Sequence, residues 1–576
     1  MNTLVIVLIA AVVLVCAYAG YGRWLTKTWG VDPNAKTPAV RLEDGKDYVP
    51  TKGWTVFAHQ FSSIAGAGPV TGAIQAAAFG WLPVLLWVLI GGVFFGAVTD
   101  FGALYASVKN DGKSMGLLIE KYIGKTGRKL FLLFCWLFCG IVIAAFADMV
   151  AGTFNAFDAE GAPVEAAFTN GAAGMVSIMF MVFAVVFGFI QKKFNFSGWR
   201  EAVIGIVFIV LSFAVGMNCP LVFGKAAWSY ITFVYIFFAA VLPMWMLKQP
   251  RDYMTTFMFG AMIAGAVIGL LVAHPTMNLP VFTGFNNAKL GTMFPILFVT
   301  VACGAVSGFH SLVSSGTSSK TVENEKDMLK VGYGAMVLES LLAVLALCVA
   351  GAAAAADGTP ATGTPFQIFS RGVAGFFEMF GVPVSIATVF MTMCVSALAL
   401  TSLDAVARIG RMSFQELFSV DDMEHAEGWR KLCCNVYFST FITLVFGFIL
   451  TQIGYANIWP LFGSANQLLS ALVLATLCVF LKVTGRNNKM LFPPLVIMLC
   501  VTFTALVQRL IAMVKAISAA ASTAIPAGET TWGAVFIANG LQLILAVLLI
   551  VLGLNIVFHS VKSYTTCDAP EAKATV

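Results

Sequence analysis

The chain has 576 residues, of which 59% are hydrophobic and only 11% are charged, with a mean hydropathy of +0.89 and a net charge of +6. So few polar residues cannot coat a soluble globule of this length, which excludes a soluble protein and makes the lipid bilayer the expected solvent. Lys and Arg form no run dense enough for a nucleic-acid interface, so nucleic acid is excluded as a partner.

Apolar stretches long enough to cross the hydrocarbon core occur about fifteen times, which predicts an all-α polytopic membrane protein. The first stretch, residues 4–24, has no Lys or Arg before Arg23 and so lacks the basic start of a cleaved signal peptide. We therefore expect it to be a retained span. The stretches begin near Leu4, Trp54, Leu82, Lys129, Gly171, Glu201, Ala227, Met254, Met293, Val331, Val382, Leu432, Ile458, Leu491 and Trp532.

The loops between these stretches alternate in basic content, as the positive-inside rule requires. Loops such as residues 155–170 and 357–381 carry one Lys or Arg or none. We expect those loops and the N-terminus outside, and the C-terminus inside. The basic loops, expected to be cytoplasmic, are residues 23–52, 109–129, 192–200, 248–251, 320–330, 408–431 and 482–489.

Two segments have a composition that is unusual for a membrane span. Residues 59–72 read HQFSSIAGAGPVTG and residues 302–320 read ACGAVSGFHSLVSSGTSSK, so each places Gly, Ser and one His at membrane depth. This composition predicts broken helices. The segments lie in the second and ninth spans, which run in opposite directions, and paired broken helices in antiparallel halves are typical of inverted-repeat transporters with a site at the midplane.

The chain is accordingly divided into four parts within one membrane domain. Residues 1–53 are an N-terminal span with a cytoplasmic loop, and residues 54–290 are a first repeat with additional helices. Residues 291–490 are a second, inverted repeat, and residues 491–576 are accessory helices with a tail.

The breaks themselves supply candidate binding groups. Glycines and a proline free backbone carbonyls and amides, and serines add hydroxyls, so the breaks can coordinate a cation or hold a carboxylate. The alternative role is close packing of helices by small residues. The substrate-site candidates are Ser62, Ser63, Gly66, Gly68 and Pro69 in the first segment, and Gly304, Ser307 and Gly308 in the second.

His59 and His310 are two of the five histidines in the chain, and each lies in one of the broken segments. A coupling proton or a substrate carboxylate is one possible ligand for them. A structural histidine that donates to a freed carbonyl is an equally good interpretation. Both residues are kept as site candidates.

Four acidic residues lie in or near apolar spans, where an ionised group costs about 2.5 to 3.5 kcal/mol on insertion scales. These candidates for ion coupling are Asp100, Asp148, Glu339 and Asp404. Asp100 lies about two turns from the basic loop at Lys109, so it is either a snorkelling charge or a relay. Asp148 and Glu339 have no cation nearby in sequence, so their partners must come from other helices.

Asp404 has Arg408 four residues later, at helical spacing, and this arginine is its expected ion-pair partner. Hydroxyls on the same span are then better cation ligands than Asp404 itself, because small hard cations take several oxygen ligands. These hydroxyl candidates are Ser396, Thr401 and Ser402.

Asn466 and Gln467 are neutral amides in the span sequence LFGSANQLLS. A tie between helices is favoured for both, and Asn466 is also kept as a substrate-site candidate. No Walker loop, Gly-x-Ser-x-Gly elbow or His-Glu-x-x-His helix is present, so we predict no enzymatic activity, no cofactor and no bound metal. The predicted partners are the lipid bilayer and a small-molecule substrate.

Six motifs cover most of the chain in the order HQFSSIAGAGPVTG, FGWLPVLLWVLIGGVFFGAVTDF, FPILFVTVACGAVSGFHSLVSSGTSSK, GYGAMVLES, TSLDAVARIGR and FGSANQLL. Through them the sequence resembles the carbon starvation protein A family. The resemblance implies the LeuT-like fold of the amino acid, polyamine and organocation superfamily, with two inverted five-helix repeats whose first and sixth helices are broken. That core has four spans between its broken helices and this chain has six, so two extra helices are expected.

Members of that family are associated with uptake of peptides and of pyruvate, with proton coupling for the pyruvate carriers. The resemblance thus implies a secondary active transporter of the bacterial inner membrane, with the first break facing Thr401 and Ser402. We expect proton-coupled uptake of pyruvate or a related small carboxylate. Proton- or sodium-coupled peptide uptake and a channel are the alternatives, because hydroxyls suit Na⁺ whereas His59, His310 and Asp404 suit a proton.

Overall fold

The computed structural model describes residues 2–567 except residues 46, 159, 195–197, 244, 289, 421–426 and 523–531. The predicted C-terminal tail from residue 568 lies outside the described residues, as do parts of the predicted basic loops 192–200 and 408–431. The helices of the first half are α1 (Thr3–Ala17), α2 (Arg23–Trp29), α3 (Pro38–Arg41), α4 (Gly53–Ile64), α5 (Gly68–Ala76), α6 (Trp81–Gly91), α7 (Ala97–Val108), α8 (Met115–Tyr122), α9 (Lys125–Phe154), α10 (Ala167–Phe194), α11 (Trp199–Asn218), α12 (Lys225–Val241) and α13 (Lys248–Ala273).

A two-stranded antiparallel hairpin, β1 (Asn286–Asn287) and β2 (Gly291–Thr292), separates the two halves. The helices of the second half are α14 (Met293–Thr300), α15 (Gly308–Gly316), α16 (Ala335–Ala353), α17 (Pro365–Glu378), α18 (Val384–Phe418), α19 (Gly428–Cys434), α20 (Val436–Thr451), α21 (Tyr455–Val483), α22 (Phe492–Ser522) and α23 (Trp532–Thr566).

Among the described residues, 11 helices are long and apolar enough to cross a membrane, or up to 12 if the bent pair α19 and α20 is one span. The predicted all-α, polytopic class is therefore confirmed. The remaining predicted spans correspond to shorter helices, which are α12 and the two broken pairs α4/α5 and α14/α15.

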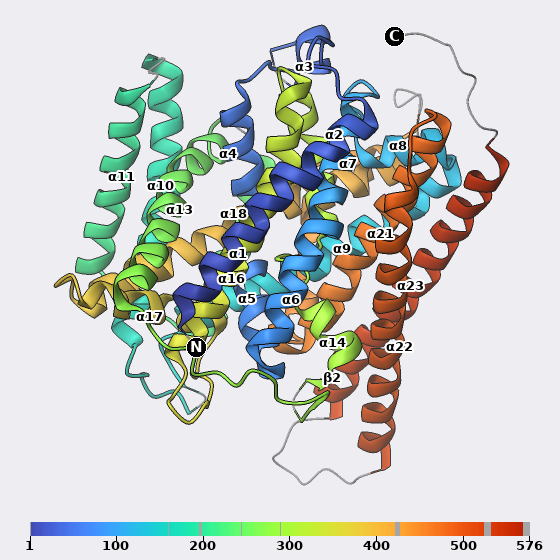
Figure 1. The fold of residues 1–576 in the computed structure, drawn as a ribbon. Helices are drawn as coiled ribbons and strands as arrows, with labels where there is room; N and C mark the ends of the chain where they lie inside the picture. Colours follow the sequence, from blue (N-terminus) through green and yellow to red (C-terminus); the bar gives the residue numbers. More distant parts are fainter. Residues whose placement is uncertain are drawn as a thin grey trace.

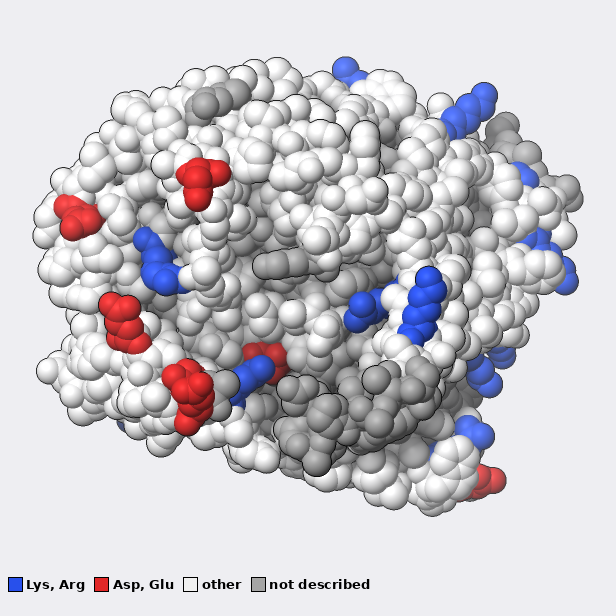
Figure 2. Space-filling model, turned by 90° about the horizontal axis from the view of Figure 1, so that it is seen from below, with Lys and Arg blue, Asp and Glu red and all other residues white. Residues whose placement is uncertain are grey.

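The helices run mostly between two faces of the molecule, and basic loops gather at one of them. α1 begins at the lower face of Figure 1 and α23 ends at the upper face, where α3 and α8 also lie. α3 and α8 belong to the predicted basic loops 23–52 and 109–129. Figure 2 shows the lower face, on which charged side chains of both signs are scattered among uncharged ones.

The centre of the bundle is built from α9, α18 and α21. The most apolar part of α21 is 100% buried, whereas the corresponding part of α11 is only 17% buried, so α11 faces lipid along most of its length. α10 and α11 form one edge of the molecule, and α22 and α23 form the opposite edge (Figure 1).

The two broken pairs run in opposite directions. α4, the first half of one pair, packs against α15, the second half of the other, and α5 packs against α14. This crossed pairing is what antiparallel broken helices produce. Both predicted interruptions are present, at residues 65–67 and 301–307.

The prediction that residues 357–381 form only an outer loop is wrong, because this stretch contains α17. Its Phe366, Phe369 and Val373 recur at helical spacing and are buried. Thr364 and Gln367 form a capping box at the start of the helix, with the backbone N–H of Gln367 donating to Thr364 Oγ1 at 3.3 Å. The loop therefore folds back as an amphipathic helix.

Candidate functional site

The first break separates α4 from α5 beside α18. Pro69 lies in the first turn of α5 and has no backbone N–H, so α4 cannot continue through it as one helix. A Cβ atom on Gly66 would overlap the Ser402 hydroxyl of α18, and one on Gly68 would overlap the Cys303 side chain of the second break. The two glycines therefore allow close approach of both neighbours.

The second break is held by two amides of α21. Gln467 Nε2 donates at 2.7 Å to the Phe298 carbonyl near the end of α14. Asn466 Oδ1 accepts at 3.1 Å from the Phe309 amide at the start of α15, and its Nδ2 donates at 3.0 Å to Ser307 Oγ. Both amides thus tie helices together, as the sequence favoured, and they satisfy backbone groups that the break exposes.

A small cavity of about 20 Å³, which is room for about one water molecule, lies between the two breaks. Its polar lining comes from His310, Ser402 and Asn466, and Cys303 adds a thiol. Its remaining walls are Ile64, Gly66, Gly68, Phe138, Val142, Phe146, Phe309, Val406 and Phe462. An apolar pocket with a few convergent polar groups is the usual form of a small-molecule site.

Five of the predicted site residues line this cavity, namely Gly66, Gly68, His310, Ser402 and Asn466. The others do not line it. Ser62, Ser63, Pro69, Gly304, Ser307 and Gly308 lie within or directly beside the breaks, and His59 lies half-buried farther along α4. Ser396 and Thr401 are buried on α18, where Thr401 Oγ1 donates to the Ala397 carbonyl at 2.8 Å.

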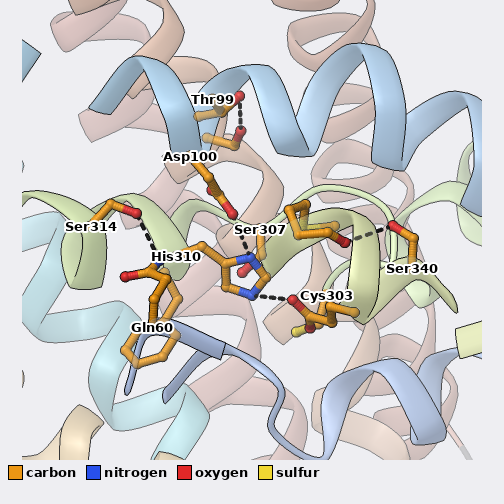
Figure 3. Close-up of polar contacts among 12 residues, drawn as sticks. Gln60, Thr99, Asp100, Cys303, Ser307, His310, Ser314 and Ser340 are labelled. Atoms are coloured by element: carbon orange, nitrogen blue, oxygen red, sulfur yellow. Dashed lines mark hydrogen bonds and ion pairs between the residues drawn. The ribbon is translucent and has the colours of Figure 1, made fainter. Parts of the chain in front are cut away.

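Three ionisable side chains from different helices meet behind the cavity, and we call Asp100, His310 and Glu339 the histidine centre. His310 Nδ1 lies 3.1 Å from Asp100 Oδ2, and His310 Nε2 lies 3.3 Å from Glu339 Oε2. All three residues are 0% exposed. Figure 3 shows the imidazole of His310 pointing at the Asp100 carboxyl, with Ser307, Cys303 and Ser340 nearby. The partners of Asp100 and Glu339 therefore come from another helix, α15.

Gln60 on α4 bonds to the helix that carries His310. Gln60 Nε2 donates to Ser314 Oγ at 2.8 Å, and Gln60 Oε1 accepts from Ser318 Oγ at 2.6 Å. All three residues are buried, and Figure 3 shows the contact between Gln60 and Ser314. Gln60 lies in the distinctive segment 59–72 but was not among the candidates, because a single sequence does not show that its amide reaches α15.

A second buried group of charges lies at α12, α13 and α18, and we call Tyr235, Arg251, Asp252 and Asp404 the arginine centre. Arg251 Nη1 binds both Asp404 Oδ2 and the Tyr235 hydroxyl, and that hydroxyl donates to Asp404 at 2.8 Å. Arg251 Nη2 lies 3.8 Å from Asp252. Arg251 and Asp404 are each 1% exposed.

Two predictions about these charges are wrong. Arg408 does not pair with Asp404, because its guanidinium donates to the Ala239 and Leu242 carbonyls at 2.7 and 3.0 Å, at the C-terminal end of α12. Residues 248–251 are not a loop, because α13 begins at Lys248 and carries Arg251 into the protein. No short-range pattern distinguishes this arginine from a loop charge.

Asp148 lies apart from both centres. Lys225 Nζ at the start of α12 lies 2.8 Å from its Oδ1, and the Tyr455 amide at the start of α21 donates to its Oδ2 at 2.8 Å. Its partners come from other helices, as the sequence required. The geometry joins the ends of three helices and is structural.

Known proteins resemble this chain in sequence over most of its length. The sequence matches the family described as carbon starvation protein CstA over residues 2–362 and 351–505. The peptide transporter CstA of Escherichia coli is 31% identical over 88% of this chain and 80% of its own length, and the pyruvate/proton symporter BtsT of E. coli is 36% identical over 61% of this chain and 49% of its own. A solved manganese transporter of Eremococcus coleocola aligns over 91% of this chain and 99% of its own, at 10% identity and a TM-score of 0.47.

The family match extends over most of the described membrane helices, including both breaks and the residues of the cavity. The related proteins from E. coli are named as transporters, and the chain has the many apolar helices of a multi-pass membrane protein. The chain therefore belongs to the carbon starvation protein CstA family of membrane transporters.

Proposed function

We propose that this protein is a secondary active transporter of the bacterial inner membrane that imports pyruvate or a related small carboxylate together with a proton. The observation that carries the proposal is the enclosed cavity between two antiparallel helix breaks, lined by His310, Ser402 and Asn466. Such a site at a pair of broken helices is where inverted-repeat transporters bind their substrates.

The polar groups of the cavity favour a small carboxylate. The cavity has a volume of only about 20 Å³, which is room for about one water molecule, so it must widen before a substrate binds. A bound carboxylate would then lie with its charge toward His310 and Asn466. Peptide uptake is the second candidate, because the relatives from E. coli and Bacillus subtilis that align over most of this chain are named peptide transporters.

The coupling ion proposed is the proton, with Na⁺ as the alternative. Two carboxyls and an imidazole are buried directly behind the cavity, and side chains of these types form the proton relays of membrane transporters. A Na⁺ site needs several oxygen ligands. Ser402 is the one predicted hydroxyl on the cavity wall, which favours the proton.

The proposed topology has about fifteen crossings, with the N-terminus outside, and a LeuT-like core of two inverted repeats. The support for the repeats is the crossed packing of the two broken pairs, α4 on α15 and α5 on α14. We assign α10 and α11 as the two additional helices of the first repeat. Single cysteines placed in residues 109–129 should react with an impermeant reagent only from the cytoplasmic side, and reaction from outside would reverse the topology.

The function is tested with the purified full chain in proteoliposomes. Radiolabelled pyruvate should accumulate when the interior is made alkaline, and a labelled dipeptide should not. Replacing Na⁺ by choline should leave pyruvate uptake unchanged. Dipeptide accumulation without pyruvate accumulation would show that the protein is a peptide carrier. Pyruvate uptake that requires Na⁺ would show that Na⁺, and not the proton, is the coupling ion.

A further inference from the structure

We propose that the histidine centre is the binding site of the coupling proton, and that the contacts of Gln60 with Ser314 and Ser318 separate this site from the cytoplasmic face. The inference rests on the proposed function, since it assigns a place to the proton of that symport. It follows from the arrangement of three buried ionisable groups and from what surrounds them.

The geometry of the histidine centre sets the smallest number of protons that it must hold. Each ring nitrogen of His310 faces one carboxyl, Asp100 at Nδ1 and Glu339 at Nε2. A neutral imidazole has one N–H, so it can donate to only one of them. If both carboxyls were ionised beside a neutral ring, two negative charges would lie unpaired at membrane depth, which is strongly disfavoured. The centre therefore holds at least one proton more than a neutral imidazole beside two carboxylates would hold.

The described part of the chain places no permanent cation beside the two carboxyls of the histidine centre. Among the described residues, no Lys or Arg lies within ion-pair distance of Asp100 or Glu339. Among the described residues, the ionisable groups at His310 are these two carboxyls, with the Cys303 thiol on the same cavity wall and the neutral Asn466 from α21. His59 of α4 does not line the cavity, and Lys109 at the end of α7 is paired with Glu325. Only the protons shared within the centre can balance its charge.

These two facts define a loaded and an unloaded state. With an imidazolium, one carboxylate and one carboxylic acid, the net charge of the centre is zero. Release of one proton leaves an imidazolium between two carboxylates, with a net charge of minus one. A monocarboxylate that moves with this proton adds no net charge, so the loaded carrier avoids moving a charge through the low-dielectric core.

A row of buried hydroxyls indicates the direction in which the proton leaves the histidine centre. Beyond His310, α15 and the turn after it carry buried hydroxyls that lead toward residue 320, in a loop predicted to be cytoplasmic. These are Ser311, Ser314, Ser315, Ser318 and Ser319, all 0% exposed. Gln60 of α4 bonds to two of them, at 2.8 and 2.6 Å. Movement of α4 away from α15 would break both bonds and let water reach the hydroxyls.

The experiment uses wild-type protein and the variants Asp100→Asn, His310→Gln and Glu339→Gln in proteoliposomes, with pyruvate as the probe. An interior more alkaline by one pH unit should give roughly tenfold accumulation in the wild type for one proton per monocarboxylate. Each variant should lose this accumulation, with an inside-to-outside ratio of about one. At least one variant should keep pyruvate exchange between equal concentrations, which needs binding but no net proton movement.

Matched control substitutions are His559→Gln on α23 and Glu378→Gln at the exposed end of α17, which should accumulate pyruvate like the wild type. Three independent substitutions keep the test valid if one variant fails to fold. Accumulation retained in every folded variant would overturn the assignment, and so would loss of exchange together with accumulation in all of them.

Infrared spectroscopy of the wild type provides a readout that needs no transport. The centre should show the C=O stretch of a buried protonated carboxyl, and this band should be lost or shifted in Asp100→Asn or Glu339→Gln. If wild-type protein fails to transport pyruvate, the proposed function falls, and this band still decides the proton site. A missing band, or one unchanged in both variants, would overturn the proposal.

Discussion

The histidine centre and the arginine centre are both buried at membrane depth, but they differ in how their charge is balanced. In the arginine centre, the guanidinium of Arg251 binds Asp404 and Tyr235, and Asp252 lies beside it. An arginine stays charged at all accessible pH values. In the histidine centre, the only group among the described residues that can supply a positive charge is the imidazole of His310, which is a cation only when both ring nitrogens are protonated.

This difference indicates two roles for charge inside one bundle. A permanent cation balances the charge of its neighbours, so we expect the arginine centre to join α12, α13 and α18 rather than to carry the coupling proton. The histidine centre lacks such a cation, so its proton content is free to change when the cavity opens to either side. The burial of an acidic residue therefore says little about whether it binds the coupling proton. Whether its partner is an arginine or a histidine says more.

Substitution of Arg251→Met should have the largest effect on stability. It leaves Asp404 buried without its cation, and breaking a buried ion pair in this way costs about 3 to 5 kcal/mol. The measurement is the free energy of unfolding in detergent. The double variant Arg251→Met, Asp404→Leu removes both charges and should recover most of the loss. A double variant as unstable as the single one would show that the pair is not the source of the effect.

Substitution of Gly66→Ala should have the next largest effect, and it acts between the two centres. α18 presents Ser402 to the cavity and carries Asp404 two residues later. The new methyl group would overlap the Ser402 hydroxyl, and overpacking of this kind costs about 1 to 3 kcal/mol. Pyruvate transport and stability should both fall.

The matched rescue is Ser402→Ala in the Gly66→Ala background, because it removes the overlapped oxygen. Stability and proton-driven transport should both recover. If stability recovers and transport does not, the Ser402 hydroxyl itself binds the substrate or the coupling ion. Unchanged transport in Gly66→Ala alone would show that the close approach of α18 to the break is dispensable.

Substitution of Gln60→Ala should have a smaller effect. It removes two buried hydrogen bonds of α4, one to Ser314 of α15 and one to Ser318 in the turn after it, each worth about 0.5 to 1.5 kcal/mol. Backbone hydrogen exchange in α15 should become faster, because α4 then holds it less tightly. Gln191→Ala, which removes a bond to Glu201 at the periphery, is the control and should leave exchange in α15 unchanged. Equal exchange in the two variants would rule out a closing role for Gln60.

Much of this architecture follows from local patterns in the sequence. Apolar runs, loop charges and the Gly/Ser composition of two segments are short-range features, and they predicted the polytopic class and both helix breaks. Pro69 and the glycines around it act on the backbone next to them. His310 was found because it lies within such a segment, and Asn466 because it is a neutral amide in an apolar span.

The pairing of charges depends on which helices meet, and a single sequence carries little information on that. Helical spacing predicted an ion pair between Arg408 and Asp404, but Asp404 is paired with Arg251 of another helix. Glu339 was predicted only to have a partner elsewhere, and that partner is His310. α17 was missed because its apolar residues were read as part of a loop, although the capping box of Thr364 and Gln367 marks its start.

Substitution of Glu339→Gln should change stability least. Glu339 has no cationic partner except His310, and its carboxyl oxygens make no hydrogen bond among the described residues. A neutral amide of the same size removes an ionisable group from the core without creating a cavity, so the free energy of unfolding should change by less than about 1 kcal/mol. The same measurement on Arg251→Met is the reference. A loss as large as that of Arg251→Met would mean that Glu339 is held as a permanent charge, and the distinction between the two centres would then disappear.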